Sequence, residues 1–444
     1  MTPALGGAVI SLALVAAAPG PWPAQRAPAR ARGRAPAAAA ADTETAAYET
    51  AGVRVIQRID RGSDVVAARV YLLGGTRQLV PVTAGIEPLL LRASGYGTAQ
   101  YPGPEARRAM ARTGSRVVIE AGSDWTVFGF TGLAGKFTAS WRVLADRLVA
   151  PTLADSAVET ARALLLADVR SRYADPDERI RLMATRSRFR GHPYSLDPWG
   201  TDFSVPQITR SQLVAYHDSQ VVKSRLLVVV SGNVDRPTVE QLVGETLGRL
   251  PAGTYRWTMP PPAPALDARW LIESRQLPTN YILGYFTGPP PQSRDYPAFV
   301  VATGLLSGAV GGAVRTRRGL SYAAYAPLVE QAIPVGGVYA STASPGDVMR
   351  ILDDEMRLLQ GIRIPQQWID EMVARSELEI GTEDQEAELL AHAEIYFGDY
   401  RRAGPNMARL RRVTSQDLAT VSDKYLRYMS LAFIGDTTKM HGHW

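Results

Sequence analysis

Residues 208–213 have the sequence Ile-Thr-Arg-Ser-Gln-Leu, and residues 413–418 have the related sequence Val-Thr-Ser-Gln-Asp-Leu. Each stretch leads into a predicted helix, an apolar strand and a glycine with a polar neighbour, Gly232-Asn233 or Gly435-Asp436. The helix cap and the turn therefore match in both halves. A repeat spaced by nearly half of the chain predicts a duplicated α+β domain. The alternative is that both are ordinary helix–strand–glycine turns.

A proline-rich segment separates the two halves of the chain. Pro260, Pro261, Pro262 and Pro264 interrupt any regular element, because proline fixes its own backbone torsion and lacks an N–H. We therefore expect an interdomain linker around them. The expected segments are, in chain order, a first domain at residues 46–250, the linker at 251–268, a second domain at 269–438 and a tail at 439–444.

Hydrophobic periodicity predicts the elements within each half. Residues 53–56 and 65–73 are apolar, and the turn residues Gly62-Ser63-Asp64 lie between them, so we expect a β-hairpin there. Further strands are expected at residues 117–119, 126–131, 225–231, 281–286 and 431–434, and helices at residues 86–95, 104–113, 137–149, 155–172, 238–250, 296–307, 346–360, 366–380 and 384–398.

The first residues are typical of an export signal. A weakly apolar run at residues 4–18 is short for a membrane span, and small residues follow it. Met1-Thr2-Pro3 departs from such signals because it has no Lys or Arg. We expect a signal peptide at residues 1–24, a disordered Ala/Pro/Arg-rich leader at residues 25–45, and a periplasmic mature protein with no stable membrane span. An uncleaved anchor or a misassigned start is the alternative.

Composition excludes several classes of function. The chain has 444 residues, of which 46% are hydrophobic and 21% charged, an ordinary balance for globular domains. The net charge of +6 is not gathered into a long basic run after Thr45, so we expect no nucleic-acid partner. The absence of cysteine excludes disulfides, Cys-ligated zinc and thiol catalysis.

Several motifs together resemble the insulinase/pitrilysin family of zinc metallopeptidases over about residues 50–437. Gly191-His192-Pro193-Tyr194, followed by Trp199-Gly200-Thr201, resembles a stretch near the end of the family's first domain. Gly74-Gly75-Thr76-Arg77 up to Gly85 resembles the approach to its zinc helix, and residues 303–325 resemble its second-domain signature. The resemblance implies an α+β fold of two homologous domains, each a mainly antiparallel sheet flanked by helices, forming half of a clamshell chamber.

The zinc motif of this family is degenerate in this chain. A His-x-x-Glu-His helix supplies two metal ligands and a general base, and the matching positions hold Pro88, Leu91 and Arg92. Proline has no donor atom, leucine cannot act as a base, and arginine brings a permanent positive charge. The third ligand position falls near Asp168. One carboxylate cannot form a metal site by itself. We expect instead an amphipathic core helix, with Asp168 solvated or paired to a nearby arginine.

The histidines give no second zinc motif. His192 lies in the His-Pro-Tyr turn, and His217 and His392 lie on predicted helices without a His or Cys partner four residues away. His441 and His443 are in the tail and could chelate a metal only loosely. We expect no metal and no cofactor in this chain.

The second-domain signature is intact. Gly304, Gly308, Gly311 and Gly312 precede Arg315-Thr316-Arg317-Arg318-Gly319-Leu320-Ser321-Tyr322. In the family, an Arg and a Tyr at this spacing bind the substrate backbone near the scissile carbonyl, and Arg315 and Tyr322 match that pair. A guanidinium and a phenol can both donate to a carbonyl oxygen. A surface arginine and a packed tyrosine are the bland alternatives.

The resemblance implies a non-catalytic subunit of a heteromeric zinc peptidase. Arg315 and Tyr322 would bind a peptide or unfolded protein segment, and an edge strand near residues 116–121 could pair with its backbone. A homologous partner subunit with an intact motif would supply the zinc. The alternative is a structural or scaffold protein of the envelope with no role in peptidase activity. An active zinc peptidase using a shifted site is the third reading.

Overall fold

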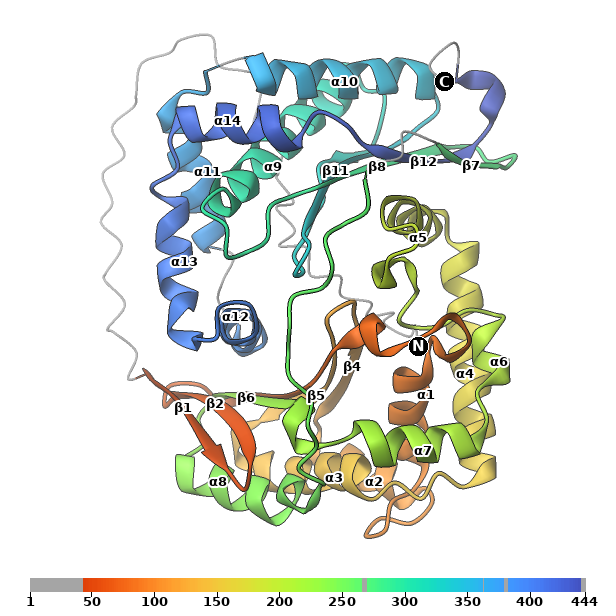
Figure 1. The fold of residues 1–444 in the computed structure, drawn as a ribbon, viewed down its shortest axis with the longest axis vertical. Coiled ribbons are helices and arrows are strands. Elements are labelled where there is room, and N and C mark those ends of the chain that lie inside the picture. Colours follow the sequence, from red (N-terminus) through yellow and green to blue (C-terminus); the bar gives the residue numbers. More distant parts are fainter. Residues whose placement is uncertain (1–42, 266–269, 362, 379–381, 441–444) are drawn as a thin grey trace.

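The computed structural model describes residues 43–265, 270–361, 363–378 and 382–440 (Figure 1). The expected signal peptide, most of the expected leader and the last four residues of the tail lie outside the described residues. The first strand, β1, begins at Thr43. Residues 43–45, expected as the end of the leader, are therefore part of a sheet.

The first domain contains a six-stranded sheet in the order β1-β2-β6-β3-β5-β4. The expected hairpin between residues 53–56 and 65–73 is wrong, because β6 lies between β2 and β3 and pairs with both. Every residue of β6 is buried, so this apolar strand takes a central place and separates its neighbours. The strands are β1 (Thr43–Thr50), β2 (Val53–Asp60), β3 (Val65–Leu73), β4 (Arg116–Ala121), β5 (Trp125–Leu133) and β6 (Leu226–Gly232).

Helices of the first domain pack on the outer face of this sheet around fully buried aromatic side chains, among them Phe128, Phe130 and Trp141. The helices expected from periodicity in this domain are found, and α5 and α6 were not expected. The helices are α1 (Ile86–Ala93), α2 (Glu105–Thr113), α3 (Phe137–Val149), α4 (Asp155–Ala174), α5 (Pro176–Arg188), α6 (Ser204–Gln207), α7 (Arg210–Gln220) and α8 (Arg236–Glu245).

The second domain has a sheet in the order β10-β11-β8-β12-β7, with β9 also paired to β11. Of its strands, only β8 and β12 were expected; β11, which was not, pairs with β8, β9 and β10. The strands are β7 (Leu271–Ser274), β8 (Asn280–Thr287), β9 (Ala323–Tyr325), β10 (Leu328–Val329), β11 (Val335–Thr342) and β12 (Ser430–Gly435). The helices are α9 (Tyr296–Val310), α10 (Pro345–Gly361), α11 (Gln366–Leu378), α12 (Glu383–Phe397), α13 (Ala403–Leu410) and α14 (Ser415–Tyr425).

The two sheets share one pairing pattern, which confirms the predicted pair of α+β domains. β2 and β6 are parallel, as are β7 and β12, and the next pairings, β6–β3–β5 and β12–β8–β11, are antiparallel in both. Thr209 and Thr414 both form capping boxes. Gly232 and Gly435 both end their strand at positive φ, 131° and 147°, where a side chain would collide with a neighbouring strand.

One helix of each domain packs against the sheet of the other domain. α12 of the second domain packs on β6, β3 and β2 of the first, and α5 of the first domain packs on β8 and β12 of the second (Figure 1). The α12 contact is apolar at its centre, where Ala387, Leu390, Ala391 and Ile395 meet Ile56, Ala67, Tyr71, Val127 and Val229. The α5 contact joins Ile180, Met183 and Ala184 to Leu283, Tyr285, Ala432 and Ile434. The inner face of each sheet is thus covered by its neighbour.

The proline-rich segment is attached to the first domain over the part that the structure describes. Residues 251–265 contain no helix or strand. His192 Nε2 lies 3.1 Å from the carbonyl oxygen of Pro261, and Arg188 Nη1 donates to the carbonyl of Pro264 at 3.0 Å. Burial lowers the pKa of His192. The His-Pro-Tyr turn therefore fixes the path of the chain between the domains.

One helical stretch of the described residues, Tyr296–Thr316, is long and apolar enough to cross a membrane. Within the most apolar part of this stretch, 78% is buried inside the protein. α9, which forms most of this stretch, packs against α10, α11, α13 and α14. Its hydrophobicity is thus accounted for by the core of the second domain.

Candidate functional site

The degenerate motif lies on α1, as expected. Gly85 precedes the helix, so Pro88 falls in the first turn, where a missing N–H costs no helical hydrogen bond. Pro88 is buried, and Leu91 is only 1% exposed within the core of the first domain. Two of the three motif positions therefore hold packing residues in the interior of the domain.

Arg92, the third motif position, forms an ion pair with Asp168. Its Nη1 lies 2.6 Å from Asp168 Oδ2 on α4, and its guanidinium lies 5.4 Å from the centre of the Trp199 ring. The structure thus brings together the residues at the second-histidine and third-ligand positions. The two residues form a direct pair of a cation and a carboxylate. This arrangement does not fit zinc, because the guanidinium occupies the place beside the carboxylate that a bound metal ion would take.

A second polar network holds the start of α1. Glu87 is fully buried and accepts hydrogen bonds from Arg225 Nη2 at 2.9 Å, from the Tyr216 hydroxyl at 2.7 Å and from Thr126. Burial and the neighbouring Glu87 carboxylate raise the pKa of Tyr216, so this phenol stays a donor. A buried carboxylate with three donors, one of them a paired arginine, is satisfied, and the network is structural.

The end of α1 is held by another buried arginine. Arg147 Nη2 donates to the carbonyl of Leu91 at 2.8 Å, and burial lowers its pKa to about 10. The guanidinium also lies 4.9 Å from the centre of the Phe128 ring. It therefore shares with the Ser94 hydroxyl, also 2.8 Å away, the capping of a carbonyl near the end of this short helix.

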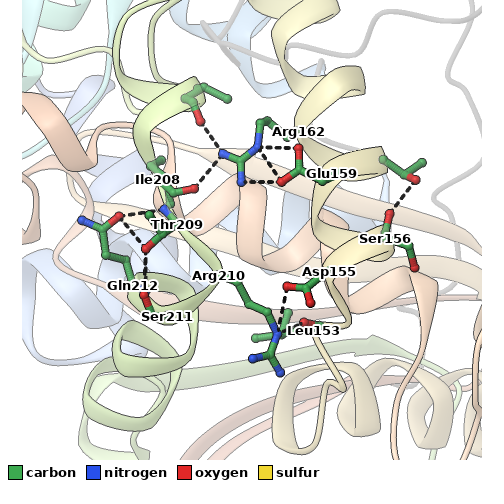
Figure 2. Close-up of polar contacts among 12 residues, drawn as sticks. Leu153, Asp155, Ser156, Glu159, Arg162, Ile208, Thr209, Arg210, Ser211 and Gln212 are labelled. Carbon is green, nitrogen blue, oxygen red and sulfur yellow. Dashed lines mark hydrogen bonds and ion pairs between the residues drawn. The ribbon is translucent and has the colours of Figure 1, made fainter.

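The family-like stretch around Ile208 and Thr209 fastens α7 to α4. Arg162 donates from Nη1 to the carbonyls of Val205 and Ile208, both at 2.7 Å, and Arg210 donates to the carbonyl of Leu153 at 2.6 Å (Figure 2). Glu159 pairs with Arg162 on the same helix. These contacts fix the helix that carries Asp168, so the stretch has a structural role here.

Arg315 and Tyr322 are both exposed in the second domain. Arg315 lies in the π-helical turn Gly311–Thr316 that continues α9, and Tyr322 is 95% exposed just before β9. Neither side chain makes a hydrogen bond or an ion pair with a described residue. The neighbouring Arg317, by contrast, pairs with Glu355 at 2.8 Å. The pair is therefore free to meet a ligand, and it is not placed by packing.

The expected edge strand is found at β4. It is the last strand of the first sheet and pairs with β5 alone. Val117 and Ile119 pack toward the core of the first domain, so Arg116, Val118 and Glu120 lie on the opposite face, which is the face that α12 covers. An extended peptide could pair with this free edge.

Sequence reasoning missed Asp124, which joins the two domains. This buried carboxylate accepts hydrogen bonds from the hydroxyls of Tyr194 and Tyr396 and from the backbone N–H of Ala332. Burial raises its pKa. Tyr194 belongs to the His-Pro-Tyr turn, while the other two donors belong to the second domain. No local signal marks Asp124, because its partners are distant in the sequence.

The described residues contain no group of three or more His, Cys, Asp or Glu that could hold a metal ion. His217 lies 3.0 Å from Asp218, and His392 lies 3.5 Å from Glu388, each with one carboxylate only. His441 and His443 lie outside the described residues.

Comparisons with known proteins identify relatives of the chain. Residues 207–375 match the family model described as the peptidase M16 inactive domain. An uncharacterized zinc protease of Mycobacterium tuberculosis is 25% identical over 390 residues, which cover 84% of this chain and 88% of the relative. Cytochrome b-c1 complex subunit 1 of Homo sapiens is 23% identical over a region that covers 64% of this chain and 60% of that subunit. Mitochondrial-processing peptidase subunit beta of Blastocladiella emersonii is 21% identical over a region that covers 53% of this chain and 51% of that subunit.

Solved structures share the fold. The peptidase M16 inactive domain from Pseudomonas fluorescens superposes with a TM-score of 0.80 at 17% identity, covering 89% of this chain and 98% of the other. A chain of complex III from Candida albicans superposes with a TM-score of 0.75 at 15% identity, covering 88% and 95%. These likenesses confirm the two-domain α+β architecture.

Proposed function

We propose that this chain, a homologue of the M16 zinc proteases that matches their inactive domain, is a non-catalytic subunit of a heteromeric zinc peptidase. The observation that carries the proposal is the contrast between its two candidate sites. The zinc positions are filled by buried packing residues and by the Arg92–Asp168 ion pair. Arg315 and Tyr322 are exposed and have no partner among the described residues.

The chain would contribute substrate binding to the complex. A guanidinium and a phenol hydroxyl both donate hydrogen bonds, so Arg315 and Tyr322 can bind a peptide carbonyl. The free edge of β4 offers backbone N–H and C=O groups to an extended segment. The fitting substrate is a peptide or an unfolded protein segment, because only an extended backbone can pair with a strand edge.

The partner would be a homologous subunit with an intact zinc motif. One of the relatives is by name a subunit of a processing peptidase, which supports a heteromeric assembly. In this arrangement the partner supplies zinc, base and attacking water. Residues 1–24 would direct the chain to the periplasm, as their apolar run and small residues suggest.

The test is reconstitution. The chain and its zinc-motif-bearing homologue are purified both together and separately. Cleavage of unfolded peptides is then measured for each chain alone and for the mixture. We expect activity from the mixture and little from either chain by itself. Full activity of the homologue alone, or failure of the two to associate, would contradict the proposal.

The second candidate is a structural subunit without a role in proteolysis. It is favoured by the similarity to a cytochrome b-c1 complex subunit and by the likeness to a chain of complex III. In that case Arg315 and Tyr322 are relics. Replacing both with Ala would then leave the assembly and its activity unchanged, whereas the peptidase-subunit proposal requires a loss.

A further inference from the structure

The stripe of α12 that faces β5 contains one carboxylate that has no arginine or lysine of the described residues at ion-pair distance. Asp384, Glu388, His392 and Tyr396 recur every four residues and so share one side of the helix. Three of them have partners in the first domain, and these partners follow β5 from Thr131 toward Asp124: Asp384 accepts from Thr131, His392 packs on Trp125, and Tyr396 donates to Asp124.

Glu388 is the exception in this stripe. Its only partner at ion-pair distance among the described residues is His392 Nε2, 3.5 Å away on the next turn of α12. Burial lowers the pKa of His392, so this imidazole is neutral near pH 7 and does not compensate the carboxylate.

The charges that face Glu388 from the packed elements are mostly negative. β4 contributes Glu120, which lies opposite Val127 in the register of β4 and β5, and the chain between β10 and β11 contributes Glu330. Asp384 lies one turn earlier on α12. The pKa of Glu388 is raised to about 8, mainly by burial and in addition by the Glu330 and Glu120 carboxylates, while Arg69 lowers it. Burial likewise raises the pKa of Glu120.

The cations nearby are already committed. Arg69 of β3 pairs with Asp384 and donates to the carbonyl of Phe130, and Arg116 of β4 lies 3.4 Å from Asp384. The remaining titratable neighbour is Tyr71 of β3, whose pKa burial raises, so it stays neutral. The Glu120 and Glu388 carboxylates therefore repel each other across the interface between the first sheet and α12, and no arginine or lysine in the part of the chain that the structure describes forms an ion pair with either.

We propose that the docking of α12 on the first sheet is a pH-sensitive clasp between the two domains, closed more tightly in acidic than in alkaline solution. The apolar contact of Leu390 and Ile395 and the ion pairs Arg58–Glu383 and Arg54–Glu394 hold the clasp, and the repulsion between the Glu120 and Glu388 carboxylates opposes it once both are ionised. Because α12 covers the face of the sheet that ends at β4, a looser clasp exposes this face.

The direction follows from proton linkage. A carboxyl whose pKa is raised by docking binds a proton when the helix docks. Its stabilising contribution is complete below its ordinary pKa of 4.5 and is lost as the pH rises through about 8. Between these limits, one linked proton lowers the docking constant by at most about tenfold per pH unit. Asp124, whose pKa burial also raises, acts in the same direction at the end of the stripe.

The experiment is hydrogen exchange of the α12 backbone amides in the full chain at pH 6.0 and pH 7.5, expressed as protection factors so that the intrinsic pH dependence is removed. We expect protection of α12 to be about tenfold or more lower at the higher pH in the native sequence. Glu388→Gln should make the fall between the two pH values much smaller, leaving only the contribution of Asp124. Glu371→Gln, on an exposed position of α11, is the control and should behave as the native sequence does.

A fall in protection that is unchanged in Glu388→Gln would overturn the proposal. Should that variant not fold, Glu120→Gln tests the same repulsion from the other side of the interface. It removes a like charge, so the fall between the two pH values should become smaller, and an undiminished fall would be equally decisive against the clasp. Neither readout depends on peptidase activity.

Discussion

The Arg92 guanidinium and the Asp168 carboxylate lie 2.6 Å apart, and their contact joins α1 to α4. In a zinc peptidase of this fold a metal would join these two helices. Here the cross-link is made by side chains alone, with the arginine between Asp168 and the Trp199 ring. The ion pair thus links the two helices directly through their side chains.

Arg92→Met should destabilise the first domain modestly. The pair is partly exposed, so its loss should lower the free energy of unfolding by about 1 kcal/mol. Denaturant unfolding measures this change. The control is Arg142→Met, which removes an exposed pair with Glu245 and should cost less. Equal effects of the two variants would mean that the Arg92–Asp168 contact adds nothing special.

The chain should not depend on zinc. Proline and leucine offer no ligand, and Arg92 is a fixed cation, so treatment with a chelator should leave the thermal unfolding midpoint unchanged. Elemental analysis of the chelator-treated protein should find far less than one zinc per chain. A variant with His441→Ala and His443→Ala controls for loose chelation by the tail. A midpoint that falls on chelation and recovers with zinc would contradict this reading.

The buried Glu87–Arg225 pair should be far more sensitive than the Arg92 pair. Both side chains are almost completely buried, so Arg225→Met leaves a carboxylate in the core without its cation. We expect a loss of about 3–5 kcal/mol in the free energy of unfolding. Adding Glu87→Gln to the same chain should recover part of the loss, because the amide can still accept from Tyr216 and Thr126. No recovery in the double variant would show that the cost is one of packing.

The interdomain carboxylate should respond to the loss of one donor. Tyr396→Phe removes a hydrogen bond to Asp124 and leaves its other two donors, so we expect a loss of about 1–2 kcal/mol. The control is Tyr400→Phe, whose hydroxyl makes only a long, exposed contact of 3.4 Å with the carbonyl of Thr45. The measurement is denaturant unfolding of both variants. A smaller effect at Tyr396 than at Tyr400 would refute the role given to Asp124.

Sequence patterns predict the regular elements and the duplication well, because these depend on local signals. The capping boxes at Thr209 and Thr414 and the glycines after β6 and β12 are local features, and the structure confirms them. The hairpin between β2 and β3 fails for the opposite reason. Its turn residues are a true local signal, but pairing is decided by β6, which is more than 150 residues away.

The candidate site divides in the same way. The degenerate positions on α1 and the partnership of Asp168 with an arginine could be anticipated from residue types. Asp124 and the carboxylates around Glu388 could not, because their neighbours come from both domains and meet only through the exchange of α5 and α12. Such contacts leave no periodic trace in the sequence.

Arg315→Ala and Tyr322→Phe should separate function from stability. Both side chains are exposed and make no polar contact with the described residues, so the free energy of unfolding should change by less than about 0.5 kcal/mol. If they bind the substrate carbonyl, each change should lower the peptidase rate of the reconstituted mixture by about tenfold or more. Arg294→Ala, at another highly exposed position of the same domain, is the matched control and should leave the rate unchanged. Unaltered rates in all three variants would assign Arg315 and Tyr322 to a surface without function and would favour the structural subunit.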